Sequence, residues 1–114
     1  MTVTIYHNAK CSTSRNVLAL LREAGVEPRI VEYLKTPPSR AELKRLVKRM
    51  GAKMSDIVRW KEPIAGELGL DADSSDDTLL DAMEAHPVLI NRPIVVTDGA
   101  VKLCRPSETV KELL

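Results

Sequence analysis

The residues best suited to chemistry lie in one short polar segment, residues 7–15, which contains Cys11, one of the two cysteines in the 114-residue chain. A cysteine that ionises to a thiolate is a nucleophile. The motif Cys11-Ser12-Thr13-Ser14 ends in serine where a dithiol redox loop would have its second thiol. Any disulfide formed at Cys11 must therefore be resolved from elsewhere. The alternative is that Cys11 is a small buried residue in an ordinary loop, since free cysteines are often simply core residues.

The flanking residues predict that Cys11 lies where a strand passes into a helix. Residues 3–6 are β-branched or aromatic, and after the loop apolar residues recur at helical spacing up to Gly25: Val17, Leu18, Leu21 and Ala24. The first N–H groups of a helix lack partners within it and the helix dipole is positive there, so a thiolate is favoured and an oxyanion can be bound. Three residues could each serve as the N-cap: Ser12, Thr13 and Ser14.

A second strand and several helices are expected to follow. Residues 27–34 predict a strand that Pro37 and Pro38 stop. Ser39 and Glu42 form a capping-box pattern for an amphipathic helix that ends at Gly51. Shorter helices are predicted at residues 55–60 and 63–68, and a firmer one starts at Asp76 and is closed by Pro87.

The last third of the chain predicts a hairpin and a final helix. Residues 94–97 and 100–104 have strand character, and the Asp98-Gly99 pair between them is a strong hairpin signal. Pro106 then opens a helix whose inward residues are Val110, Leu113 and Leu114. Strands that flank a helix should be parallel, and a hairpin is antiparallel. The order therefore predicts one α/β domain over residues 1–114, with a thioredoxin-like mixed four-stranded sheet flanked by helices and a helical insert at about residues 39–86.

Charge and composition limit the class of protein. Residues 1–60 carry 12 basic and 5 acidic side chains, whereas residues 61–114 carry 5 basic and 11 acidic ones. The basic group on the predicted helix at 40–50 is read as its solvated face, and only three aromatic residues are available to stack on bases, so nucleic-acid binding is not expected. No signal peptide or apolar run of membrane-spanning length is found, which predicts a cytoplasmic protein with reduced thiols. A bond between Cys11 and Cys104 remains open at this stage.

Three arginines are candidates for binding an oxyanion. Arg59 ends a short predicted helix, Arg92 precedes Pro93, and Arg105 follows the last strand. A guanidinium group can bind a tetrahedral oxyanion and hold a thiolate in its charged form. Each arginine taken singly could instead be a surface residue or part of a salt bridge. Proline is tolerated at the start of a strand, and the bond before Pro93 could be cis.

Other chemistry is less well supported by the pattern. A phosphatase loop of the C-x5-R type would need arginine at position 17, which is Val17. His7 could hydrogen-bond the loop and influence the pKa of Cys11, or it could be a buried histidine with a structural partner. The two histidines and two cysteines lack the paired spacing of zinc ligands, so no metal is expected. Cys104 alternates with apolar neighbours and is interpreted as core.

Several motifs in order resemble the glutaredoxin-dependent arsenate reductase family of the thioredoxin-like superfamily. They are Ile5-Tyr6-His7-Asn8, Cys11-Ser12-Thr13-Ser14-Arg15-Asn16, Pro37-Pro38-Ser39-Arg40, residues 86–96 and Leu103-Cys104-Arg105-Pro106-Ser107-Glu108. The resemblance implies that Cys11 is the nucleophile and that Arg59, Arg92 and Arg105 bind the oxyanion. It also implies that His7, Ser14 and Arg15 support the loop and that the Arg92-Pro93 bond is cis.

The implied activity is reduction of arsenate to arsenite, as in arsenic detoxification. The resemblance implies no bound cofactor, glutathione as co-substrate and glutaredoxin as the protein that reduces the resulting mixed disulfide. Two other functions remain open. One is a non-enzymatic Spx-type regulator that binds RNA polymerase, although such proteins commonly carry C-x-x-C, and Ser14 with the three arginines argues against it. The other is a general thiol transferase without arsenate specificity.

Overall fold

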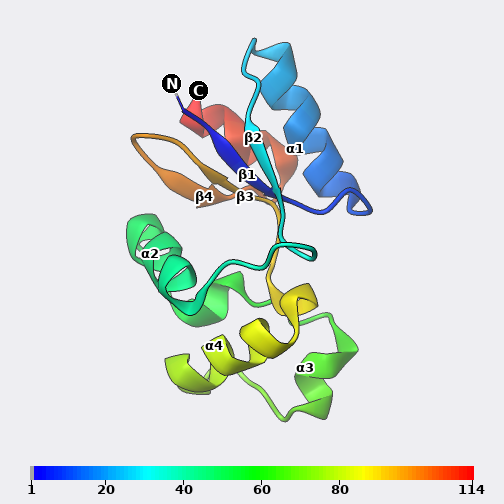
Figure 1. The fold of residues 1–114 in the computed structure, drawn as a ribbon, viewed down its shortest axis with the longest axis vertical. Helices are drawn as coiled ribbons and strands as arrows, with labels where there is room; N and C mark the ends of the chain where they lie inside the picture. The colour runs from blue at the N-terminus through cyan, green and yellow to red at the C-terminus, as the bar shows by residue number, and fades with distance from the viewer. Residues whose placement is uncertain (1) are drawn as a thin grey trace. The chain divides into compact units, whose positions relative to one another are not determined.

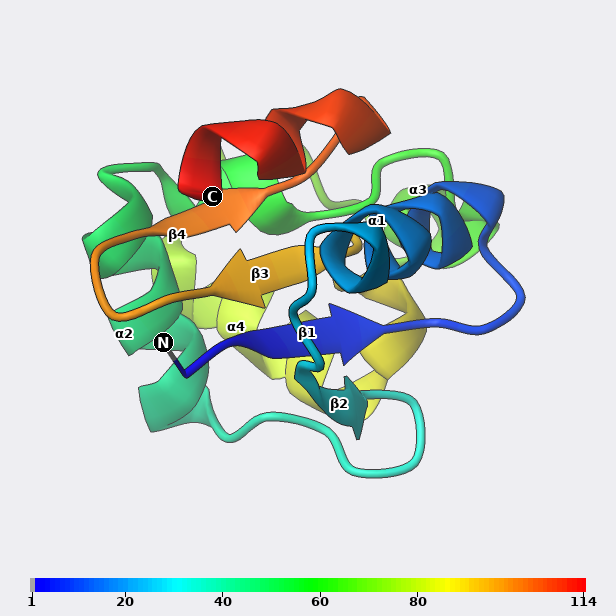
Figure 2. The ribbon, with the colours of Figure 1, turned by 90° about the horizontal axis from the view of Figure 1, so that it is seen from above.

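A four-stranded mixed sheet forms the centre of the first compact unit, and the computed structural model describes residues 2–114 of the chain. The strands are β1 (Thr4–His7), β2 (Arg29–Glu32), β3 (Ile94–Val96) and β4 (Val101–Leu103). Their order in the sheet is β2-β1-β3-β4, with β1 and β2 parallel and the other two pairs antiparallel (Figure 2). The predicted mixed sheet, including the parallel first pair and the hairpin, is confirmed.

The register explains why β1 is the central element. Ile5 lies beside Ile30 of β2 on one side and beside Val95 of β3 on the other, and its side chain is completely buried. β-Branched residues fill such a doubly flanked position well because they pack on the pleated surface. The C-terminal end of this strand delivers His7 to the polar loop that contains Cys11.

Two helices cover one face of the sheet. Helix α1 (Ser12–Glu23) and the 3-10 helix η3 (Ser107–Leu113) pack against each other and share a core with the strands (Figure 2). That core contains Val3, Ile5, Val17, Leu21, Val95, Cys104, Val110 and Leu113. Helix α1 ends in a Schellman arrangement, since Val26 N–H donates to Leu21 O and Gly25, at φ +81°, donates to Arg22 O.

Two predictions about element ends were wrong. The second strand stops at Glu32 because the N–H groups of Lys35 and Thr36 both turn back to Glu32 O, so the chain bends before the prolines. The last helix has 3-10 geometry and leaves Leu114 47% exposed, whereas Val110 and Leu113 are buried as predicted.

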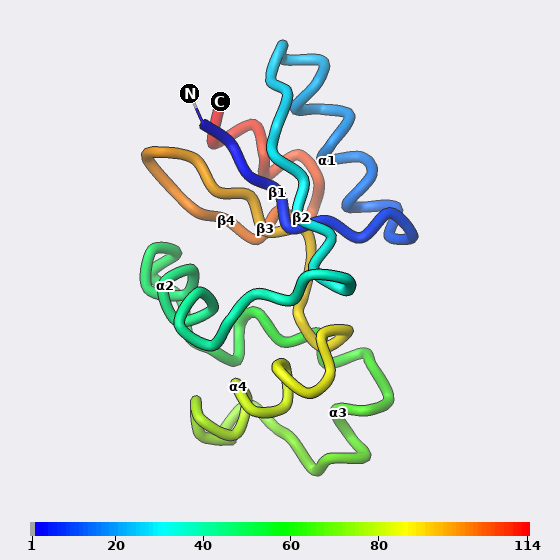
Figure 3. The backbone as a smooth tube through the Cα atoms, viewed as in Figure 1, coloured from blue at the N-terminus to red at the C-terminus, as the bar shows by residue number. Residues whose placement is uncertain are grey.

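The second compact unit spans Pro37–Asn91, and its regular elements are helices joined by turns, with one isolated bridge between Val58 and Ile90. Figure 3 traces the chain from β2 into this unit and back out to β3. Its elements are α2 (Arg40–Met50), η1 (Met54–Ile57), α3 (Pro63–Glu67), α4 (Asp76–Ala85) and η2 (Pro87–Leu89). Figure 1 labels the three α-helices of this unit. Its buried apolar side chains include Leu43, Leu46, Val47, Ile57, Leu79, Leu80, Met83 and Leu89.

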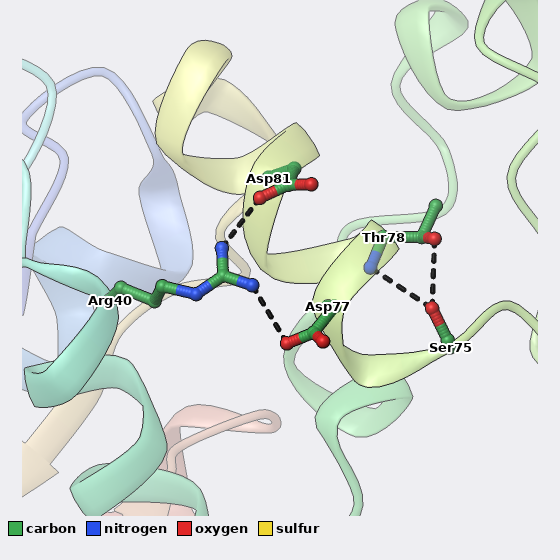
Figure 4. Close-up of polar contacts among 5 residues, drawn as sticks. All are labelled: Arg40, Ser75, Asp77, Thr78 and Asp81. Atoms are coloured by element: carbon green, nitrogen blue, oxygen red, sulfur yellow. Dashed lines mark hydrogen bonds and ion pairs between the residues drawn. The ribbon is translucent and has the colours of Figure 1, made fainter.

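Polar contacts set the ends and the pairing of the two longer helices of this unit. Ser39 Oγ accepts the Glu42 N–H at 3.1 Å, which confirms Ser39 as the N-cap of α2, and Ser75 caps α4 in the same way. Arg40 joins α2 to α4, because its two terminal nitrogens lie 2.8 Å from Asp77 and 2.6 Å from Asp81 (Figure 4). Both carboxylates are exposed, so solvent and salt weaken this ion pair. Across residues 2–114, no helix has the length and apolar character needed to cross a membrane.

Candidate active site

Cys11 is itself the N-cap residue of α1. Its backbone is extended, at φ −92° and ψ 121°; its N–H donates to Asn8 O and its carbonyl accepts the Arg15 N–H, both at 3.0 Å. The prediction that Ser12, Thr13 or Ser14 caps the helix was therefore wrong. The Cys11 side chain makes no capping hydrogen bond, and the Ser14 hydroxyl is not available as a cap because it pairs with the Asn8 N–H and with His7.

The guanidinium groups of Arg105 and Arg92 both contact the Cys11 sulfur. Arg105 Nη1 lies 3.7 Å from Cys11 Sγ and also donates to Arg92 O at 2.8 Å, and the Arg92 side chain hydrogen-bonds the sulfur as well. Partial burial acts to raise the pKa of the Cys11 thiol. The Ser14 N–H, Arg105, Arg92 and the Thr13 N–H together outweigh that effect and lower it. The site therefore favours the thiolate.

A buried chain of hydrogen bonds through Asn8, Ser14 and His7 holds the loop in place. Ser14 is completely buried; its Oγ accepts the Asn8 N–H at 3.1 Å and lies 2.6 Å from His7 Nδ1. Burial lowers the pKa of His7, which favours the neutral imidazole at pH 7, and its Nδ1 shares a hydrogen bond with the Ser14 hydroxyl. Arg15 closes the other side of the loop by donating from Nη1 to Ala9 O at 2.9 Å.

A cis-proline follows each of the two arginines. The Arg92-Pro93 bond is cis, as the family resemblance implies, and Pro93 O accepts the Cys104 N–H at 2.9 Å. The Arg105-Pro106 bond is also cis, which the sequence reading missed. Its only signal is the X-Pro pair itself, because cis bonds in proteins are almost confined to proline.

Cys104 has the opposite environment to Cys11. Its side chain is completely buried in the core of the first unit, as predicted, and burial raises its pKa to about 12. Both cysteines are free, so the bond between them that was left open from sequence is not formed.

The two environments predict selective alkylation. At pH 7 to 8, iodoacetamide should modify Cys11 and leave Cys104 intact in the folded protein, because only Cys11 has substantial thiolate character and access. The rate at Cys11 should rise through a midpoint below that of a free cysteine, since the pKa of Cys11 is lowered. Peptide mass spectrometry locates the adduct, and denatured protein, in which both cysteines should react, is the control. Equal labelling of Cys104 in the folded chain would contradict this assignment.

Arg59 belongs to the second unit. Its side chain is 22% exposed, and its Nε lies 3.3 Å from a carboxylate oxygen of Glu62, a partner that was not predicted. Its main-chain N–H donates to Leu89 O at 2.7 Å, and one step away Asn91 N–H donates to Ile57 O at 2.7 Å. These bonds fix the Arg59 segment beside Leu89 and Asn91 within the second unit.

The structure thus gathers most of the predicted site residues in the first unit. Cys11, Arg92 and Arg105 are in mutual contact, and His7, Ser14 and Arg15 hold the loop. Residue His86 lies apart from the loop in sequence and forms the C-cap of α4. Among the described residues, no group of three or more histidine, cysteine or carboxylate side chains is arranged to hold a metal ion.

A reactive cysteine at a helix N-terminus, preceded by a central strand and contacted by an arginine that precedes a cis-proline, defines a thioredoxin-like protein. A sequence model of the ArsC family matches residues 6–113, and the chain belongs to that family.

Individual relatives agree with this assignment. The chain is 56% identical to an arsenate reductase of Rhizobium meliloti (strain 1021) over 115 residues, which cover 100% of the chain and 82% of the relative. It is 51% identical to an arsenate reductase of Escherichia coli over 98% of the chain and 80% of that protein. The solved arsenate reductase from Vibrio cholerae superposes with a TM-score of 0.94 at 49% identity, covering 100% of this chain and 98% of that one. The predicted thioredoxin-like fold is therefore confirmed.

Proposed function

We propose that this chain is an arsenate reductase that uses Cys11 as nucleophile, glutathione as co-substrate and glutaredoxin as the final reductant. The observation that supports it most directly is the contact of Arg105 and Arg92 with the Cys11 sulfur, because the same positive groups that stabilise a thiolate can bind an arsenate oxyanion. The arsenate reductases among the relatives support the choice of oxyanion.

In the first step the Cys11 thiolate attacks the arsenic atom of arsenate. An S–As bond forms, one arsenic–oxygen bond breaks, and the leaving oxygen takes up protons and departs as water, so arsenic remains pentavalent. Arg92 and Arg105 neutralise the charge that gathers on the arsenate oxygens. We include Arg59 in this role because the resemblance to the arsenate reductase family implies it.

In the second step a glutathione thiolate attacks the Cys11 sulfur. The new S–S bond forms as the S–As bond breaks, and the bonding electron pair stays on arsenic, which leaves as trivalent arsenite. Because the loop ends in Ser14 and Cys104 is buried, neither described residue offers a second thiol to the mixed disulfide. Glutaredoxin then attacks the glutathione sulfur and releases the Cys11 thiolate. The reducing cytoplasm would supply both reductants.

Arsenite release from arsenate tests this proposal. We expect turnover with arsenate, glutathione and glutaredoxin together, and loss of multiple turnover when either reductant is omitted. The same preparation is assayed with a glutathione mixed disulfide of a small thiol. Faster turnover of that disulfide with no arsenite formed would instead identify a general thiol transferase. Turnover supported equally well by a thioredoxin system would contradict the assigned reductants.

A further inference from the structure

Asn8 is a buried polar residue in the loop that precedes Cys11. It is 8% exposed and lies between the end of β1 and Cys11. Both of its main-chain polar groups and both polar atoms of its side chain have partners. The main-chain N–H donates to Ser14 Oγ at 3.1 Å and the carbonyl accepts the Cys11 N–H at 3.0 Å.

The side chain of Asn8 closes the loop on itself and anchors it to a neighbouring segment. Its Oδ1 accepts the N–H of Lys10, two residues further along the chain, at 3.0 Å, which forms an Asx turn. Its Nδ2 lies 3.5 Å from the hydroxyl oxygen of Tyr33, a completely buried residue that directly follows β2. A single side chain therefore joins the turn before Cys11 to the core beside the adjacent strand.

These contacts lead directly to the reacting atom. The Cys11 N–H donates to Asn8 O and the Cys11 carbonyl accepts the Arg15 N–H, so the Cys11 peptide joins the turn to the first turn of α1. In that turn the main-chain N–H groups of Ser14 and Thr13 help to lower the pKa of the Cys11 thiol. A charge-assisted hydrogen bond depends steeply on its geometry. If the turn at residues 8–11 relaxed, the sulfur would keep its two arginines but lose the alignment of its main-chain donors.

We propose that Asn8 is a positioning residue, which holds the residue 8–11 turn so that the N-terminal N–H groups of α1 point at the Cys11 sulfur. The proposal rests on the proposed function only in treating Cys11 as the reacting group. Asn8 acts through the main chain and does not itself touch the sulfur in the described contacts. Its effect should therefore appear in the ionisation of Cys11 even without arsenate.

The test is the pH profile of Cys11 alkylation by iodoacetamide. In Asn8→Ala we expect the midpoint to rise by about one pH unit, which makes alkylation ~10-fold slower at pH values well below the wild-type midpoint, because the thiolate loses well-aligned donors. The substitution leaves unchanged the two charged groups at the sulfur, Arg92 and Arg105, and the titratable His7 that pairs with Ser14. Asn8→Ser should shift the midpoint less, since a serine hydroxyl can accept the Lys10 N–H in a similar turn.

Thr97→Ala is the matched control. Thr97 is also a buried polar residue of the first unit whose side chain closes a turn, because its Oγ1 accepts the Gly99 and Ala100 N–H groups in the hairpin. The Thr97→Ala variant should have a lower thermal stability than the wild type but the same alkylation midpoint. A wild-type profile for folded Asn8→Ala would overturn the proposal. If Asn8→Ala does not fold, Asn8→Ser replaces it: serine keeps an acceptor for the Lys10 N–H but loses the contact with Tyr33, so the midpoint should still rise, and an unshifted midpoint would overturn the proposal. If Asn8→Ala shifts the profile but the wild-type chain releases no arsenite from arsenate, the role of Asn8 is upheld and the proposed function is rejected.

Discussion

Cys11→Ser is expected to lower the rate of arsenite release by a factor of roughly 10³ or more, because the reaction is proposed to pass through a covalent bond to this sulfur. A serine hydroxyl stays protonated at neutral pH, and neither the arginines nor the main-chain N–H groups around it can supply the missing thiolate. The substitution is nearly isosteric and sits at an N-cap, a position that serine favours, so the fold should be retained. Steady-state arsenite production with glutathione and glutaredoxin, together with a thermal melt, measures both effects.

Cys104→Ala is the control for this result. It removes the other thiol of the chain, which lies in the core and is held protonated by burial. The variant should lose some stability through the small cavity it leaves but keep its arsenite release. Retained turnover in Cys11→Ser, or its loss in a folded Cys104→Ala, would contradict the assignment of the nucleophile.

The sheet was predictable because its signals are local. The Asp98-Gly99 pair identified the β3–β4 hairpin, and the apolar pattern on either side of the polar loop identified β1 and α1. Element ends depended on longer-range bonds that no pattern records. The turn of Lys35 and Thr36 back to Glu32 O ends β2 early, for example, and does not follow from residue types.

The candidate site was only partly predictable for a similar reason. Cys11 could be placed at the start of a helix because a strand pattern precedes it and a helix pattern follows. The pairing of Ser14 with His7 and Asn8 could not be derived, because a serine in the first turn of a helix is more often expected to cap it. Arg105 and Cys11 are separated by 94 positions in the sequence, and only the family resemblance connected them before the fold was known.

Arg105→Ala is expected to lower kcat/KM for arsenate about 10²- to 10³-fold, the range seen when one preorganised donor to a developing oxyanion is removed. The guanidinium has two tasks in the structure, since Nη1 contacts Cys11 Sγ at 3.7 Å and donates to Arg92 O at 2.8 Å. Its removal takes a positive charge from the thiolate, so the pKa of Cys11 should rise. The deficit should therefore be larger at neutral pH, where the thiolate fraction falls, than at alkaline pH, where the thiol ionises anyway.

Arg105→Lys separates the charge from the geometry. A lysine ammonium keeps the positive charge but not the planar fork, so this variant should restore most of the alkylation profile of Cys11 while kcat/KM for arsenate remains low. Lys102→Ala is the matched control, because it removes another cation of the first unit, one that forms an ion pair with the exposed carboxylate of Glu112 at 3.5 Å. If Lys102→Ala reduced kcat/KM as much as Arg105→Ala, net charge would explain the loss. If Arg105→Ala kept the wild-type kcat/KM, Arg105 would have no part in binding the oxyanion, and the contact with the sulfur would serve the thiolate alone.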